Sequence, residues 1–332
     1  MGANFSEILQ DLLYLRRQKD KFEHIFYPEY IKPPQIKAVL GARRGYISER
    51  DQYCALRNLL VVKDLYSCVR ESLHPYKYSI ADLQSQSLVV KSPEDVKKIR
   101  SAINSDSAVI CGGPETNPLI DYILNKIDSP VRVTLLKKIN LEVDGDNYTI
   151  PAGKPLSSDD FEAIAKAKAK KQYRYPHDTP YAIAEFDETG NLKEVLGSFE
   201  LYEKPACLKI NEKIIREDKP PIRKVTAMLV IYENSLIIAG TKGAATSSVV
   251  LHPYFIEKLD LEACKDLART ELNRAIIVLE ILFKERPEMI NYSELSKYPF
   301  NIPENMDKPR WDYGIQKPEH IEKIKIKRIY EF

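Results

Sequence analysis

The chain lacks several features that would fix its class at once. Its 332 residues carry 50 Lys and Arg against 48 Asp and Glu, a formal net charge of +2, so overall charge does not predict general binding to nucleic acid or to anionic membranes. Its five cysteines include no C-x-x-C pair, which argues against a disulfide framework or a structural zinc site. No apolar run reaches the roughly 18 residues of a membrane-spanning helix, and no signal peptide is recognisable. We therefore expect a globular cytoplasmic protein rather than a membrane protein.

Glycine motifs of the common nucleotide-binding folds are also missing. The 12 glycines form neither a G-x-x-x-x-G-K-[ST] loop nor a G-x-G-x-x-G fingerprint. This argues against ATP hydrolysis of the P-loop kind. The five histidines show no metal-ligand spacing, so no metal site is predicted.

What is present is an alternation of short β-branched runs with longer helical patterns. Strands are expected at 36–40, 88–90 and 108–111, with helical patterns between and after them. This alternation predicts an α/β, Rossmann-like fold with a mostly parallel sheet covered by helices. Within it, residues 131–224 predict an antiparallel insertion of hairpins, one of them turning at Asp144-Gly145.

The chain divides into three expected parts. Residues 1–34 predict an amphipathic N-terminal helix and a proline-rich linker, residues 35–289 the α/β ligand-binding domain, and residues 290–332 a C-terminal tail that packs on the body. Apolar residues at helical spacing from 261 to 284 predict a long helix, which suits core packing and a homo-oligomer interface equally well.

A further helix is expected at 158–173, with Ser158 as its cap. The lysines near its end are interpreted as a solvated face whose charge complements the helix C-terminus. They are Lys166, Lys168, Lys170 and Lys171.

Three of the expected strands run into a glycine-containing loop, at 41–45, 112–118 and 240–246. In an open α/β sheet, ligands bind at the carboxyl ends of the strands. We therefore predict one shared site for a small anionic ligand, a nucleotide or an NAD-like metabolite. The candidate binding residues are Gly112, Gly113, Thr116, Asn117, Gly240, Thr241, Lys242, Gly243, Thr246, Arg43 and Arg44.

The loop after residue 111 is the most informative of the three. Gly112 and Gly113 permit backbone angles that other residues avoid, and Asn117-Pro118 supplies a helix cap followed by a first-turn proline. The N–H groups of a helix start attract phosphate or carboxylate. A tight turn that only packs a helix on a strand is the alternative interpretation.

Two motifs resemble a known group of domains. The run AVICGGPETNPLID at 108–121 and the run LIIAGTKG at 236–243 resemble prokaryotic α/β domains that have a G-G-P-x-x-N loop and a later A-G-x-x-G-x-G-T loop. Such domains are similar to parts of S-layer-type proteins and of uncharacterised regulatory or defence-associated proteins. This chain departs from the pattern at Ala244-Ala245, where a glycine is expected before Thr246. The resemblance implies the α/β fold and the paired loops, and it implies no particular reaction.

Function remains open between three classes at this point. We favour a cytosolic sensor or regulator that binds the anionic ligand without catalysis. An enzyme acting on a nucleotide, of the N-glycosidase or transferase type, is the first alternative, and a structural assembly module is the second. The candidate catalytic residues are Glu115, Asp121 and Glu185 as acids or bases and Cys111 as a nucleophile. The alternative is that these residues have structural roles, the acids as helix caps or first-turn residues and the cysteine as a buried apolar side chain.

Overall fold

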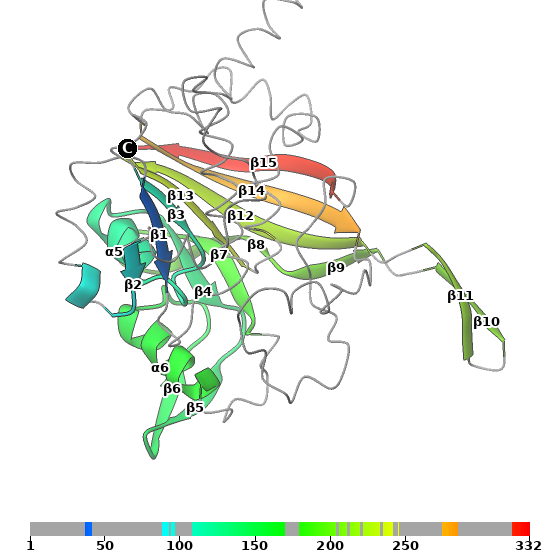
Figure 1. The fold of residues 1–332 in the computed structure, drawn as a ribbon, viewed down its shortest axis with the longest axis horizontal. Coiled ribbons are helices and arrows are strands. Elements are labelled where there is room, and N and C mark those ends of the chain that lie inside the picture. Colours follow the sequence, from blue (N-terminus) through cyan, green and yellow to red (C-terminus); the bar gives the residue numbers. More distant parts are fainter. Residues whose placement is uncertain are drawn as a thin grey trace, which may run out of the picture.

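The computed structural model describes residues 37–41, 88–92, 94–96, 108–169, 179–203, 206–210, 213–219, 222–232, 235–241, 245, 274–284 and 321–332. Its centre is an eight-stranded sheet with the order β15-β14-β12-β13-β3-β1-β2, in which β9 also pairs with β12 (Figure 1). These strands are β1 (Lys37–Gly41), β2 (Leu88–Val90), β3 (Ala108–Cys111), β9 (Glu200–Glu203), β12 (Ile222–Tyr232), β13 (Ser235–Gly240), β14 (Ala275–Lys284) and β15 (Ile321–Glu331).

Smaller elements accompany the large sheet. A three-stranded sheet has the order β4-β7-β8, and two hairpins are formed by β5 with β6 and by β10 with β11. Their bounds are β4 (Val131–Leu135), β5 (Ile139–Val143), β6 (Asp146–Ile150), β7 (Tyr181–Phe186), β8 (Leu192–Ser198), β10 (Ala206–Ile210) and β11 (Lys213–Lys219). The helices with described bounds are α5 (Pro118–Lys126) and α6 (Ser158–Ala169). The β10–β11 hairpin projects away from the other elements (Figure 1).

The prediction of a Rossmann-like α/β fold with a mostly parallel sheet is wrong. Parallel pairing is confined to β2, β1, β3 and β13, whereas β9, β12, β13, β14 and β15 pair antiparallel. The pairs of the smaller sheet and of both hairpins are also antiparallel. The error came from extending the βα alternation of residues 35–118 to the part of the body that follows the predicted insertion, up to residue 289.

Strand β14 replaces the second part of the long helix that was expected at 261–284. Nearly every residue of Ala275–Lys284 is apolar, and its side chains are buried on both faces of the sheet. A short run that is apolar throughout matches a helical period as well as a strand period. The neighbouring strands β12 and β15 decided between the two, because β14 pairs with both along its length.

The hairpin expected at Asp144-Gly145 is confirmed. Val143 pairs with Asp146, and the two turn residues have φ angles of 57° and 96°. Positive φ at both central residues matches the right-handed twist of the flanking strands. Strands β12 and β13 form a second antiparallel pair, with Tyr232 opposite Ser235 at its turn.

Helix α6 begins where the sequence predicts, but its cap is Ser157 and not Ser158. The Ser157 hydroxyl accepts from the Asp160 amide at 3.2 Å, and the Asp160 carboxylate accepts from the Ser157 amide at 2.8 Å. This reciprocal pair is a capping box, with Asp160 in the position usually taken by Glu or Gln.

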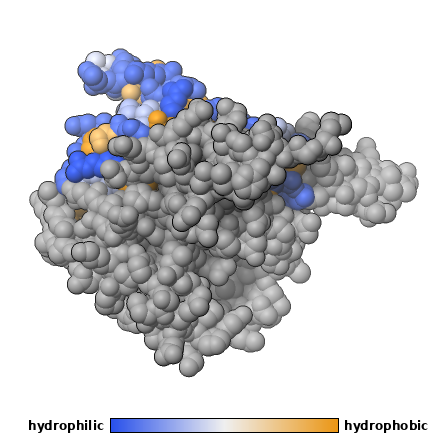
Figure 2. All heavy atoms as spheres, turned by 90° about the horizontal axis from the view of Figure 1, so that it is seen from above, coloured by the Kyte–Doolittle hydropathy of each residue, from blue (hydrophilic) through white to orange (hydrophobic). Residues whose placement is uncertain are grey.

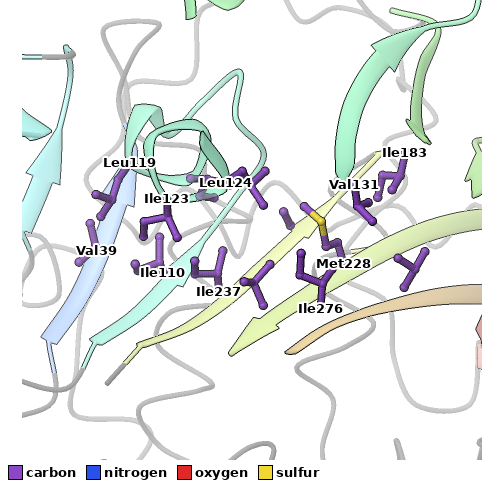
Figure 3. Close-up of a cluster of buried hydrophobic side chains, with 14 of the residues drawn as sticks. Val39, Ile110, Leu119, Ile123, Leu124, Val131, Ile183, Met228, Ile237 and Ile276 are labelled. Atoms are coloured by element: carbon purple, nitrogen blue, oxygen red, sulfur yellow. The ribbon is translucent and has the colours of Figure 1, made fainter. Parts of the chain in front are cut away.

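One face of the large sheet carries the main core. Figure 3 shows Leu119, Ile123 and Leu124 of α5 above Ile110 and Ile237, while Val131 and Ile183 of the smaller sheet lie above Met228 and Ile276. Helix α5 and the β4-β7-β8 sheet therefore cover neighbouring parts of the same face. A second cluster joins α6 to β4, β5 and β6 and centres on Phe161 and Leu135.

The surface is polar where it is coloured in Figure 2, with a few separate apolar residues. Larger exposed apolar side chains include Leu192 and Val195 on β8 and Leu201 on β9. Among the helices in the described ranges, none is long and apolar enough to cross a membrane.

Candidate functional site

The three glycine loops that the sequence predicts to share a site begin at one edge of the large sheet. In the parallel part, Leu40 pairs with Cys111, and Cys111 pairs with Ile238. Strands β1, β3 and β13 therefore run in register and end close together. The strand order also places β2 and β3 on opposite sides of β1, so the direction of the connections reverses at β1.

The glycines at these strand ends lie against one another. The Gly112 amide donates to the Ile238 carbonyl at 3.1 Å, and a Cβ atom on Gly113 would lie 3.7 Å from the Gly240 carbonyl oxygen. A Cβ atom on Gly41 would overlap the backbone of Thr116 and Asn117. We refer to Gly41, Gly112, Gly113 and Gly240 together as the glycine edge.

Of the two adjacent glycines, only Gly112 has a backbone that disfavours side chains. Its φ is 114°, in the region that L residues rarely adopt, whereas Gly113 is not among the residues with positive φ. The two glycines thus have different roles. Gly112 makes the turn after β3, and Gly113 keeps the surface next to Gly240 free of a side chain.

The start of α5 uses its N–H groups internally. The amides of Thr116 and Asn117 both donate to the Gly113 carbonyl, at 3.0 and 2.9 Å. The Leu119 amide donates to the Asn117 side chain at 3.1 Å, and the Ile120 amide donates to the Asn117 carbonyl at 3.2 Å. Pro118 has no N–H. These amides are therefore not available to an anion at the glycine edge, which would have to bind to other donors.

Several predicted binding side chains also have internal partners. The Thr116 hydroxyl donates to the Gly113 carbonyl at 3.0 Å, and the fully buried Asn117 amide donates to the Val39 carbonyl at 3.4 Å. The Thr241 hydroxyl donates to the Thr226 carbonyl at 3.3 Å and accepts from the Thr226 amide. These contacts fasten the loops to β1 and β12.

Glu115 is buried in the same loop beside two residues that the sequence analysis did not select. The Lys168 ammonium donates to both Glu115 carboxylate oxygens, at 2.9 and 2.8 Å. The Tyr181 hydroxyl donates to one of these oxygens at 2.6 Å, and the Lys168 ammonium lies 5.5 Å from the centre of the Tyr181 ring.

The interpretation of Lys168 as part of a solvated face is wrong, because its side chain is only 12% exposed. A signal for this was present in the sequence. Phe161, Ile164 and Lys168 are spaced three and four residues apart, so they lie on one side of α6, and the first two are in the core. Lys166, by contrast, is 47% exposed and lies 3.7 Å from Asp144.

Two further acidic candidates lie elsewhere. Asp121 is buried in the first turn of α5, where its charge acts on Arg132 of β4. Burial lowers the pKa of the Arg132 guanidinium, and the charges of Asp121 and Asp128 raise it in part. Asp121 therefore has a partly buried guanidinium as its electrostatic partner.

Glu185 lies at the junction between the two sheets and not at the glycine edge. One of its carboxylate oxygens accepts from Tyr330 at 2.6 Å and from Arg328 at 2.5 Å, both on β15. In the large sheet, β14, β12 and β13 separate β15 from β3. The structure therefore does not bring Glu185 together with Glu115.

The remaining candidates fall at or beyond the end of the described strands. Cys111 is the last residue of β3. Arg43, Arg44, Lys242, Gly243 and Thr246 lie outside the described residues. In the part of the chain that the structure describes, no group of three or more His, Cys, Asp and Glu could hold a metal ion.

Comparisons of the chain with protein-family models, with curated proteins and with solved structures give no match.

Proposed function

We propose that this chain is a regulatory protein that binds a small anionic, nucleotide-like ligand at the glycine edge. The observation that carries the proposal is the alignment of three parallel strands that end together in glycine-containing loops. In open sheets, ligands bind beyond the carboxyl ends of parallel strands, at the point where the direction of the connections reverses. That point is β1 in this sheet.

The geometry favours contact with backbone over contact with a helix start. Glycine allows a ligand to approach the main chain closely, and Gly113 and Gly240 lie side by side without side chains between them. Because the first amides of α5 are already bonded, the positive charge must come from side chains. Arg43, Arg44 and Lys242 follow Gly41 and Gly240 within three residues of the sequence and supply it in this proposal.

Binding is tested by calorimetric titration of the purified chain with ATP and with NAD, after mass spectrometry of any ligand released on denaturation. Lys242→Met should weaken the binding of either probe about tenfold, the usual order for one charge-assisted contact. Lys166→Met removes the same charge from an exposed position on α6 and should leave affinity within about twofold. Equal effects of the two variants would contradict a local site.

A second measurement separates a regulator from an enzyme. The wild-type chain is incubated with ATP, NAD and nucleosides, and the products are separated by chromatography. A regulator leaves every compound intact. Turnover that disappears in Glu115→Gln while probe affinity is retained would overturn this proposal in favour of an enzyme.

A further inference from the structure

The partly buried cluster of Glu115, Lys168 and Tyr181 joins three separate elements next to the glycine edge. Glu115 belongs to the loop between β3 and α5, Lys168 is the penultimate residue of α6, and Tyr181 is the first residue of β7. The contacts of 2.6 to 2.9 Å described above connect sequence positions 53 and 66 residues apart. Only the tertiary fold brings these groups together.

Because the Glu115 carboxylate and the Lys168 ammonium are largely shielded from water, each charge is stabilised by the other. The side chains of Glu115 and Lys168 are 8% and 12% exposed. A carboxylate so far from water is stable only when it is paired with a cation and its oxygens accept hydrogen bonds. Lys168 provides the cation, and Tyr181 provides an additional donor.

The cluster is also close in the chain to the proposed ligand site. Glu115 lies two residues after Gly113, which faces Gly240, and one residue before Thr116, which packs against Gly41. A shift of the Glu115 side chain would move the backbone that forms the glycine edge. A Glu115 carboxylate without the Lys168 charge beside it would in addition repel an anion there.

We propose that Lys168 is a positioning residue that neutralises Glu115, fixes the β3–α5 loop and thereby makes the glycine edge able to accept an anion. The Tyr181 hydroxyl, at the start of β7, orients the Glu115 carboxylate by its hydrogen bond. Ligand affinity then depends on the docking of α6, although Lys168 itself does not touch the ligand. The part of this inference that concerns affinity rests on the proposed function.

The affinity test compares three variants with ATP and inorganic pyrophosphate as probes. Lys168→Met removes the ammonium from the Glu115 carboxylate and should weaken both probes at least tenfold. The double variant Glu115→Gln/Lys168→Met removes both charges and should return affinity to within about threefold of the wild type, as should Glu115→Gln alone. Lys166→Met is the control with the same loss of charge from α6.

The double variant is the decisive one. If its affinity stays as low as that of Lys168→Met, the charge of Glu115 is not what weakens binding, and the proposed neutralising role of Lys168 is overturned. An unchanged affinity of Lys168→Met would overturn the inference as well.

A measurement without ligand keeps the inference separate from the proposed function. Hydrogen exchange of the Thr116 and Asn117 amides reports the loop directly, because both donate to the Gly113 carbonyl. Lys168→Met should accelerate their exchange at least tenfold and leave the Val278 amide of β14 unchanged, and the double variant should restore slow exchange. If the wild type binds none of ATP, NAD and pyrophosphate, the proposed function fails, and this exchange pattern still supports the positioning of the loop by Lys168. Unchanged exchange in Lys168→Met would overturn the inference whether or not a probe binds.

Discussion

The hydroxyl of Tyr330 on β15 donates a hydrogen bond of 2.6 Å to the carboxylate of Glu185 on β7. This contact joins the last strand of the chain to the central strand of the smaller sheet. Arg328 reinforces it through the same Glu185 oxygen and reaches Glu194 on β8 at 3.0 Å. The C-terminal strand is thus held by its ladder with β14 and by this charged group.

Removal of the Tyr330 hydroxyl should weaken this junction. We expect Tyr330→Phe to lower the free energy of unfolding by about 1–2 kcal/mol, because a partly buried hydrogen bond to a charged group is lost. Denaturant unfolding measures the change. Tyr202→Phe, at a tyrosine that is 53% exposed, is the control and should change stability by less than about 0.5 kcal/mol. Equal losses in both variants would show that the contact with Glu185 contributes nothing.

The same junction should make stability depend on pH. The hydrogen bond from Tyr330, followed by the hydrogen bond and charge of Arg328, holds the pKa of Glu185 below its ordinary value. The folded state therefore favours the ionised carboxylate. The resulting stabilisation is complete above the ordinary glutamate pKa of about 4.3 and is lost as the pH falls through the lowered value.

We expect wild type to exceed Glu185→Gln in unfolding free energy most at pH 6–7 (about two units above that pKa), with the difference shrinking in acid. Denaturant unfolding curves of both proteins, measured in steps from neutral pH down into acid, test this pH dependence. Glu188→Gln, on the exposed turn between β7 and β8, is the charge-matched control. A difference for Glu185→Gln that grows as the pH falls would contradict the sign.

The adjacent glycines should respond differently to the same substitution. Gly112→Ala places a side chain at a φ of 114° and should cost about 1–3 kcal/mol of unfolding free energy. Gly113→Ala has room for its Cβ, with the Gly240 carbonyl oxygen at 3.7 Å, and should change stability by less than about 1 kcal/mol. Thermal or denaturant unfolding of the two variants measures both changes in stability. A larger loss at Gly113 than at Gly112 would refute the assignment of the turn.

The cap of α5 should be important for stability. Asn117→Ala removes the acceptor of the Leu119 amide and the buried bond to the Val39 carbonyl. A lost cap costs about 0.5–2 kcal/mol, and we expect the upper part of that range because Asn117 is fully buried. Asn125→Ala, at an exposed position of the same helix, should be neutral or slightly stabilising since alanine favours helices. Similar losses in both variants would contradict the capping role.

Local sequence signals were sufficient where neighbouring residues settle the conformation. Asp144-Gly145 determines its own hairpin turn, and Asn117-Pro118 determines the start of α5, because the relevant hydrogen bonds and backbone angles involve residues only a few positions apart. The strand at 108–111 and its following glycine turn were predicted for the same reason. The sequence also led us to expect the ends of three strands at one edge, and the parallel pairing of β1, β3 and β13 places them there.

Only the tertiary structure decided the pairing of the remaining strands and the partner of Glu115. Residues 275–284 are almost all apolar and fit a helix or a strand, and they form a strand because β12 and β15 supply hydrogen bonds on both sides. Gly41 is required by the backbone of Thr116 and Asn117, which lies far from it in the sequence. Lys168 is in a basic run that has the composition of a solvated face, and its burial follows from the position of Glu115 on another element. Composition and spacing encode local geometry and the tendency to be buried. The contacts between distant elements depend instead on how all the elements pack and form hydrogen bonds together.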